Sequence, residues 1–387
     1  AVVHLSARSI RKPSMEWEVI GGADKGGILV REGQALSSKA CDDRLATGAS
    51  LKELQLVGDR LRYELLTGTG PKSGWVSTKI SGKELVVRRA AAPAEAVKMP
   101  EFEVLDESYL SMKKGASPTG KTPWLKMLGK TNPDAKGRLV IFSWTGNRGG
   151  QGSAHNFMKP ASPAWTEHLK SFQQYEVNYP GRGTRVKDPL YEDPAKYVTD
   201  IVVALQDALK DGLPFVLLGF SFGSILAMEV ARSLQAKDMG PLAVVVVSAE
   251  APQWPGRASL GLAGLGEARF EQMLKDKGGT EFILQDPGMK KMFVPVITAD
   301  CKLEENYRFD PSLGPLKCPV HVFFGTKEGH DKMKTLIKPE DAEGWLKISA
   351  CQKLSKVQAV DCDWYLFQDP SGCDPVAERL AELTAGF

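Results

Sequence analysis

Apolar and polar residues follow two different periods along this chain. Over residues 14–90 they alternate in short runs, and glycine or proline ends each run. Alternation with a period of two is typical of strands that bury one face. Several such runs predict a small all-β domain folded as a compact barrel, preceded by a basic, irregular tail over residues 1–13.

The pattern changes at residue 136, where short apolar runs begin to alternate with segments of helical period. Continuous apolar runs such as Phe215–Leu218 and Leu242–Ser248 indicate strands that are buried on both faces, whereas Tyr197–Lys210 carries one apolar helix face. Strands and helices in alternation favour a mostly parallel sheet. We therefore predict an α/β domain over residues 136–387.

Two segments interrupt this organisation. Residues 91–135 begin with an alanine-rich run of low complexity and continue with a loop rich in Gly, Ser, Pro and Thr, so they are predicted to be a linker. Residues 255–313 break the alternation after a core strand with a methionine-rich, mostly helical pattern. Such an insertion is typical of a lid over an apolar pocket, and extra helices that only add stability are the alternative.

Composition narrows the function classes. A net charge of +3 and the lack of a basic block argue against nucleic acid as a partner. The longest apolar runs are far shorter than the roughly 20 residues that a membrane-spanning helix needs. The six cysteines form no C-x-x-C pair, so we expect no metal centre, no cofactor and free thiols in a reducing compartment, with a disulfide between Cys362 and Cys373 as the alternative.

The small β domain resembles the Src-homology-3-like barrels, in a version found in algal proteins, through its run of short strands and the segment Gly74-Trp75-Val76 near their end. Trp17 and Trp75 are candidates for a peptide-binding groove, although core packing is the commoner role of such aromatics. The chain begins with Ala1, as would a processed protein or a trimmed chain. Together with the algal resemblance, this leads us to expect a plastid protein whose transit peptide has been removed.

The strongest chemical motif lies directly after the apolar run Phe215–Leu218. There the sequence Gly219-Phe220-Ser221-Phe222-Gly223 has the form G-x-S-x-G and precedes a helical pattern over Ile225–Leu234. This context predicts a nucleophile elbow, in which a tight turn holds the serine hydroxyl exposed above the sheet. The glycine-rich loop 146–152 follows an earlier strand over Arg138–Trp144, and it suits an oxyanion hole better than a phosphate because it lacks a nucleotide-binding fingerprint.

Further motifs occur in order around this elbow. They are Pro180-Gly181-Arg182-Gly183-Thr184-Arg185, Ser248-Ala249-Glu250-Ala251-Pro252, Gly278-Gly279-Thr280, Pro295-Val296-Ile297-Thr298-Ala299-Asp300 followed by Tyr307, and Cys318-Pro319-Val320 leading to Gly325. Together with the elbow they closely resemble the type II thioesterases, stand-alone α/β-hydrolases that accompany fatty-acid, polyketide and peptide synthases. The resemblance covers roughly residues 137–380. It implies an α/β-hydrolase fold with a helical lid, acting on acyl thioesters of acyl-carrier protein or coenzyme A.

The resemblance also implies roles by position. Ser221 would attack the thioester carbonyl, and Glu328, after the strand that begins near Cys318, would be the acid that orients the base. The oxyanion would be held by the N–H of Phe222 and by the loop at Thr145 and Gly146. Glutamate is an acceptable replacement for aspartate in this fold.

The base departs from the family pattern. The family places its histidine after the last strand in a Gly-His-Phe-Phe-like turn, and here the turn reads Cys362-Asp363-Trp364-Tyr365, with Asp363 at the histidine position. A carboxylate with an ordinary pKa of about 4 is a poor general base. His330, just after the predicted acid, and His155, in the glycine-rich region, are candidate substitutes, with a loop histidine of no catalytic role as the alternative for both. Phe220 likewise replaces a histidine that often precedes the nucleophile in the family.

Two hypotheses about function stay open. In the first, the protein hydrolyses acyl-carrier-protein or coenzyme A thioesters with an altered triad. In the second, it has lost efficient catalysis and serves as a binding or scaffold subunit of a larger assembly, with other proteins as its partners. The intact elbow favours the first hypothesis, and the missing histidine and the additional β domain favour the second.

Overall fold

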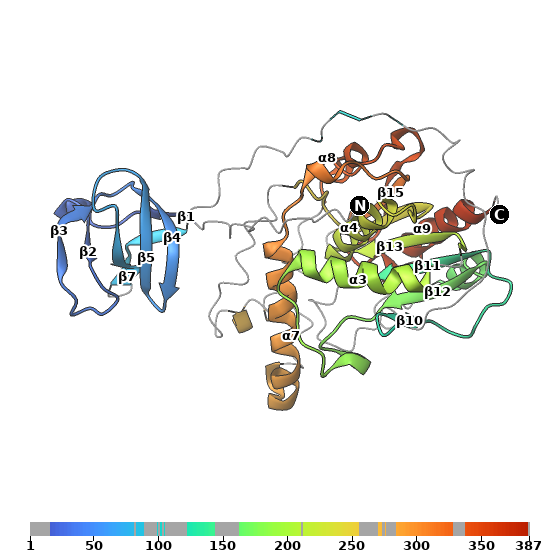
Figure 1. Cartoon of the computed structure of the whole chain (residues 1–387), viewed down its shortest axis with the longest axis horizontal. Coiled ribbons are helices and arrows are strands. Elements are labelled where there is room, and N and C mark those ends of the chain that lie inside the picture. Colours follow the sequence, from blue (N-terminus) through green and yellow to red (C-terminus); the bar gives the residue numbers. More distant parts are fainter. Residues whose placement is uncertain are drawn as a thin grey trace, which may run out of the picture. The chain divides into compact units, whose positions relative to one another are not determined.

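Figure 1 shows the computed structural model of the chain. Its described residues are 16–80, 83–88, 99, 101–102, 104, 122–143, 162–209, 212–254, 270–272, 275, 284–327 and 337–385. The chain divides into two compact units, Ala1–Ala94 and Glu95–Phe387. Each unit has its own sheet and its own apolar core.

The first unit is built from antiparallel strands. They are β1 (Glu16–Val19), β2 (Ile28–Arg31), β3 (Ala40–Leu45), β4 (Ser50–Val57), β5 (Arg60–Thr67), β6 (Ser73–Ser77), β7 (Lys79–Ile80), β8 (Lys83–Glu84) and β9 (Val86–Arg88). One sheet has the order β3-β2-β6-β5-β4-β1-β9, and β7 pairs with β8. Side chains such as Leu61 and Tyr63, two residues apart on β5, point into one core. The predicted all-β domain is confirmed, whereas its assignment to the Src-homology-3-like barrels stays a prediction.

Both tryptophans considered for a peptide groove are buried. Trp17 is 7% exposed and donates its indole N–H to Glu53 Oε2 at 2.9 Å, and Trp75 is 8% exposed. A buried ring offers little open face to a peptide. Trp17 and Trp75 therefore serve the packing of this unit, which is the role that the sequence favoured.

The second unit contains a mostly parallel sheet. Its strands are β10 (Leu125–Met127), β11 (Gly137–Phe142), β12 (Phe172–Val177), β13 (Phe215–Phe220), β14 (Ala243–Val247), β15 (Val320–Gly325) and β16 (Lys356–Val360). Their order is β10-β12-β11-β13-β14-β15-β16, and β10 alone runs antiparallel to its neighbour. Every residue of β11, β13, β14 and β15 is buried, as expected of strands that are covered on both faces.

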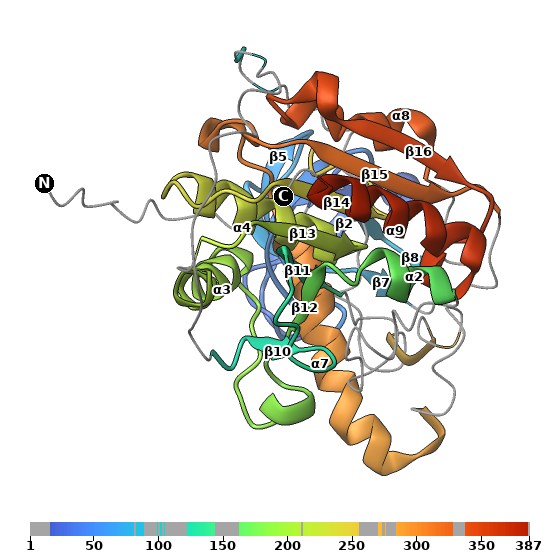
Figure 2. The ribbon, with the colours of Figure 1, turned by 90° about the vertical axis from the view of Figure 1, so that its right-hand side faces the viewer.

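Helices cover both faces of this sheet. The α-helices that the structure describes in this unit are α2 (Pro163–His168), α3 (Pro194–Ala208), α4 (Phe222–Gln235), α7 (Pro287–Asn306), α8 (Pro339–Glu343) and α9 (Pro370–Thr384). Helices α3 and α4 pack together on one face, and α2 and α9 pack together on the other (Figure 2). The layered arrangement confirms the predicted α/β class.

Helix α3 shows how the local sequence sets an element. It begins after Asp193, whose side chain accepts hydrogen bonds from the N–H groups of Ala195 and Lys196. Pro194 occupies the first helical position, where its missing N–H costs nothing. The buried side chains of α3 then recur every three to four residues, so this helix turns one apolar face to the core.

The predicted linker and the predicted lid both contain regular structure. Strand β10 lies within residues 91–135, the predicted linker, and it forms the edge of the sheet by pairing with β12. Within residues 255–313, the predicted lid, the described residues include α7. Phe270 and Phe293 belong to a small apolar cluster that is separate from the main core. Helix α7 thus has local packing of its own.

The described residues give three further findings about chemistry and environment. None of their helices has the length and apolar character needed to cross a membrane. They also contain no group of three His, Cys, Asp or Glu side chains that is arranged to hold a metal ion. All six cysteines are free thiols, and Cys362 and Cys373 are not joined by a disulfide.

Strand β15 carries a histidine inside the core. His321 is 3% exposed, and neither ring nitrogen has a hydrogen-bond partner in the described part of the chain. Burial, together with the positive charges of Arg379 and Lys356, lowers its pKa from 6.5 to about 3. His321 is therefore neutral in the folded protein under mildly acidic conditions.

Acid is expected to destabilise the second unit through His321. The unfolded chain takes up a proton at this imidazole below about pH 6.5, while the folded protein resists protonation down to about pH 3, so the free energy of unfolding falls as the pH is lowered through this window. Between about pH 6.5 and pH 4 the loss is on the order of 3 kcal/mol. Urea titrations of His321→Leu should show a much shallower loss. The control variant His168→Leu, changed at the end of α2, should lose stability as steeply as the wild type when the pH is lowered. An equally steep loss in His321→Leu would contradict this explanation.

Candidate functional site

The predicted nucleophile lies at a strained turn between β13 and α4. Ser221 has φ 54° and ψ −133°, a backbone conformation that residues other than glycine rarely adopt. Its N–H donates to the carbonyl of Val247 at the end of the neighbouring strand β14, at 2.9 Å. Its own carbonyl accepts the N–H of Ser224 at 2.9 Å. The turn is fixed from both sides, and Ser221 is the residue that precedes the first turn of α4.

Glycines on both sides of the serine permit this turn. A Cβ atom at Gly219 would lie 2.2 Å from Ser224 Cα, and one at Gly223 would lie 2.1 Å from the carbonyl oxygen of Phe142. Contacts this short with backbone atoms leave no room for a side chain, so both positions require glycine. The Gly223 contact also places the start of α4 against the end of β11.

Strand β11 leads towards the predicted oxyanion loop. Its last residue, Phe142, contacts the elbow, and Ser143 is the last described residue before the loop. Thr145 and Gly146, which were predicted to hold the oxyanion, lie outside the described residues. Phe222, the other predicted donor, is the first residue of α4, and its side chain is buried. The first N–H groups of a helix have no acceptor within the helix, which suits this position to a developing negative charge.

The turn that follows β16 lies next to the elbow. Ser248, directly after β14, donates its hydroxyl to the carbonyl of Trp364 at 2.7 Å, and the ring of Phe220 lies 6.2 Å from that of Tyr365. Asp363, at the predicted histidine position, is half-buried, and its Oδ1 accepts the N–H of Tyr365 at 2.8 Å. These contacts bring the turn of Asp363 to the sheet edge that carries the elbow.

The turn after β15 packs against the same segment. A Cβ atom at Gly325 would lie 2.2 Å from the carbonyl oxygen of Asp363, and Lys327 donates its backbone N–H to the carbonyl of Cys362 at 2.9 Å. Glu328, the predicted acid, follows Lys327 directly but lies outside the described residues. The chain leading to Glu328 and the turn of Asp363 are thus neighbours.

The described histidines lie away from the elbow. His321 pairs with Val245 inside the sheet rather than at its carboxyl edge. His168 ends α2, and the chain then enters β12, so this residue lies at the opposite edge of the sheet. His330 and His155, the candidate substitutes for the base, lie outside the described residues.

The cysteine beside Asp363 is a poor nucleophile. Cys362 is buried, and burial, with the carboxylates of Asp369 and Asp363, raises the pKa of its thiol to about 12. Because the thiolate is the reactive form of cysteine, this thiol is unreactive at neutral pH. Ser221 therefore remains the candidate nucleophile at this edge.

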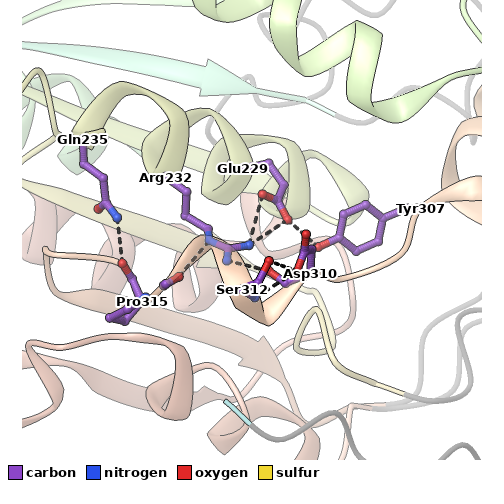
Figure 3. Close-up of polar contacts among 8 residues, drawn as sticks. Glu229, Arg232, Gln235, Tyr307, Asp310, Ser312 and Pro315 are labelled. Atoms are coloured by element: carbon purple, nitrogen blue, oxygen red, sulfur yellow. Dashed lines mark hydrogen bonds and ion pairs between the residues drawn. The ribbon is translucent and has the colours of Figure 1, made fainter. Parts of the chain in front are cut away.

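A buried polar network on the nucleophile helix was missed by the sequence analysis. Arg232 Nη1 lies 3.3 Å from both carboxylate oxygens of Glu229, and the Tyr307 hydroxyl donates to Glu229 Oε1 at 2.7 Å (Figure 3). Arg232 also donates to the carbonyls of Asp310 and Gly314. Burial raises the pKa of Glu229, against the opposing effects of Arg232 and Tyr307. Through these hydrogen bonds the segment after α7 packs firmly against α4, the helix that begins at the elbow.

A second buried ion pair joins α7 to the loop after β12. Arg182 donates to the two carboxylate oxygens of Asp300 at 2.9 and 2.7 Å, and both side chains are almost fully buried. The guanidinium also lies 5.6 Å from the ring centre of Tyr179. A bidentate pair fixes orientation as well as distance, so α7 is held firmly in its C-terminal half.

Comparison with known proteins gives one matching family. A model described as a thioesterase domain matches residues 149–381. The medium-chain S-acyl fatty acid synthase thioesterase of Rattus norvegicus is 32% identical over 224 residues, which make up 57% of this chain and 78% of the rat protein. The region matched by the family model includes the elbow and the turns after β15 and β16.

Solved structures of thioesterases share the fold of this chain. The RedJ thioesterase from the prodiginine biosynthetic pathway of Streptomyces coelicolor has a TM-score of 0.53 and 22% identity, over 65% of this chain and 92% of that chain. The type II thioesterase BorB from the borrelidin biosynthetic cluster has a TM-score of 0.53 and 22% identity, over 69% of this chain and 98% of that chain. At this level of identity the likeness concerns the fold, and it confirms the predicted α/β-hydrolase arrangement.

Proposed function

Since the chain belongs to the thioesterase family, we propose that it hydrolyses acyl thioesters of acyl-carrier protein or coenzyme A, with Ser221 as the nucleophile. The observation that carries the proposal is the backbone of Ser221, which keeps a positive φ between two required glycines. Such a conformation costs about 1–3 kcal/mol and is typical of a nucleophile elbow, although Ser221 is here 5% exposed rather than open to solvent as predicted. The substrate class comes from the resemblance to the type II thioesterases.

The proposed reaction has two steps. Ser221 Oγ attacks the thioester carbonyl, its proton passes to a base, and the C–S bond breaks to release the carrier thiol, which takes up a proton. Water then hydrolyses the acyl-serine ester and releases the carboxylic acid. The Phe222 N–H, together with the loop at Thr145 and Gly146, would stabilise the oxyanion in both steps, and Glu328 would be the acid.

Asp363 takes the place of the base in this scheme. Aspartate serves less often than histidine as the general base of such a triad, because histidine is the side chain best matched to proton transfer at neutral pH. An enzyme that lacks one member of the triad retains roughly 10³- to 10⁴-fold catalysis over water through its oxyanion hole and binding. We therefore expect slow turnover that depends on Ser221, with His330 as a further candidate base.

A second candidate function is an acyl-binding or scaffold subunit that has lost efficient catalysis. The observation that favours it is the Asp363 side chain, whose Oδ1 accepts the Tyr365 N–H and is therefore already engaged within its own turn. The additional antiparallel unit would provide a surface for protein partners in a larger assembly, for which a plastid is the expected compartment.

Turnover of acyl thioesters distinguishes these two functions. We expect the protein to hydrolyse acyl-coenzyme A and acyl-carrier-protein thioesters slowly, and Ser221→Ala to lose this activity because the attacking oxygen is gone. Thiol release measures the rate, and a circular-dichroism spectrum like that of the wild type shows that the variant folds. Release at the uncatalysed rate in both proteins, with retained binding of a non-hydrolysable thioether analogue, would favour the scaffold function instead.

A further inference from the structure

Tyr307 joins the end of α7 to the first turn of the nucleophile helix α4. It directly follows α7, and its backbone N–H donates to the Leu303 carbonyl at 3.1 Å. Its ring lies 5.9 Å from that of Phe222 at an interplanar angle of 76°, the edge-to-face arrangement that aromatic pairs prefer. Its hydroxyl donates to Glu229 Oε1 at 2.7 Å. Because Tyr307 is only 7% exposed, water competes little for these contacts.

These two contacts hold Tyr307 at both ends. Phe222 and Glu229 are seven residues apart in α4, about two helical turns, so they lie on the same side of the helix. Glu229 is held in turn by Arg232, which donates to the carbonyl of Asp310 at 2.6 Å (Figure 3). A shift of Tyr307 along α4 would therefore break the hydrogen bond at one end or the ring contact at the other.

We propose that Tyr307 is a positioning residue that sets the place of the Phe222 N–H and thereby the efficiency of attack by Ser221. The proposal rests on the proposed function, because it assumes that an oxyanion forms at this N–H. Such groups act only when they are held within about 0.5 Å of the productive geometry, and a misplacement of about 1 Å can slow a reaction roughly 100-fold.

Substitutions at position 307 separate the ring contact from the hydroxyl bond. Tyr307→Leu removes both, and we expect the rate of fluorophosphonate labelling of Ser221 at saturating probe to fall about tenfold or more, with unchanged affinity for the probe. Tyr307→Phe keeps the ring against Phe222 and loses the bond to Glu229, so its rate should fall only roughly threefold.

Gln235→Met is the matched control. Gln235 fastens the same segment to α4 by donating to the Pro315 carbonyl at 2.7 Å and accepting the Lys317 N–H at 2.8 Å, but it lies at the end of the helix far from Phe222. This variant should be labelled at the wild-type rate. If any contact between this segment and α4 were sufficient to set the labelling rate, Gln235→Met would slow labelling as well.

Amide hydrogen exchange provides a readout that needs no activity. We expect Tyr307→Leu to raise deuterium uptake in the peptide that contains Phe222, and Gln235→Met to leave it unchanged. Wild-type labelling and wild-type exchange in both Tyr307 variants would overturn the proposal and leave the proposed function intact. A wild-type protein that is never labelled would contradict the proposed function, and hydrogen exchange alone would then decide whether Tyr307 positions Phe222.

Discussion

Asp363→His should raise thioester hydrolysis by about 10²- to 10⁴-fold, because it returns a general base to the sheet edge that carries Ser221. The turn around residue 363 is anchored through its backbone, with the Ser248 hydroxyl 2.7 Å from the Trp364 carbonyl, so a new side chain should leave the turn in place. An imidazole of ordinary pKa is protonated below about pH 6.5, so the new activity should rise as the pH is raised through that value. Steady-state hydrolysis of acyl-coenzyme A across the neutral pH range measures both effects.

Two control variants define what such a gain means. Asp363→Asn matches the wild-type residue in size but has no basic group, so it should show no gain. Ser221→Ala combined with Asp363→His should lose the gain entirely. A gain that survives without Ser221 would belong to a different nucleophile, and no gain in Asp363→His would show that residue 363 is not at the base position.

Breaking the buried ion pair between α7 and the loop after β12 is expected to lower the free energy of unfolding of the second unit by about 3–5 kcal/mol. Arg182 and Asp300 are 6% and 1% exposed, so removing either partner leaves a buried charge without its counter-ion. Burial opposes the charge on Arg182, but the Asp300 carboxylate raises the pKa of the guanidinium above its ordinary value. Urea unfolding of Arg182→Met and of Asp300→Leu should both show the loss.

The double variant Arg182→Met with Asp300→Leu tests the cause. It removes both charges, so it should recover most of the stability that each single substitution loses. Lys302→Met provides a control on the same helix, because Lys302 pairs with Glu192 at 2.6 Å near the surface, where such pairs contribute at most about 1 kcal/mol. If Arg182→Met and Lys302→Met lowered the free energy of unfolding equally, burial of the ion pair would not explain the loss.

The sheet of the second unit was predictable because its central strands are buried on both faces. The runs that form β13, β14 and β15 are almost wholly apolar, and this pattern identifies buried strands without further information. The start of α4 was harder to predict. The helix begins at Phe222 rather than at the predicted Ile225, because Ser221 ends the turn in a strained backbone conformation that residue propensities do not predict. Strand β10 has three residues and forms only by pairing with β12, so its local sequence gives little sign of it.

The site was predictable where a short sequence motif determines the local backbone geometry. The spacing around Ser221 indicates the elbow because only glycine fits on either side of the turn. The pairing of Arg182 with Asp300 spans 118 positions and has no local signature. Glu229 and Arg232 lie in the helical pattern after the elbow, where polar residues ordinarily mark a solvent-exposed face. The segment after α7 packs over Glu229 and Arg232 and buries them, and this tertiary contact cannot be read from the local sequence.

The central claim is that Ser221 is the nucleophile of a thioesterase site whose base position holds Asp363. The most direct test is labelling of the wild-type protein and Asp363→His with a fluorophosphonate, followed by peptide mass spectrometry. We expect a single adduct on Ser221 in both proteins, formed faster in Asp363→His. An adduct on any other residue, or equal rates in the two proteins, would contradict the claim.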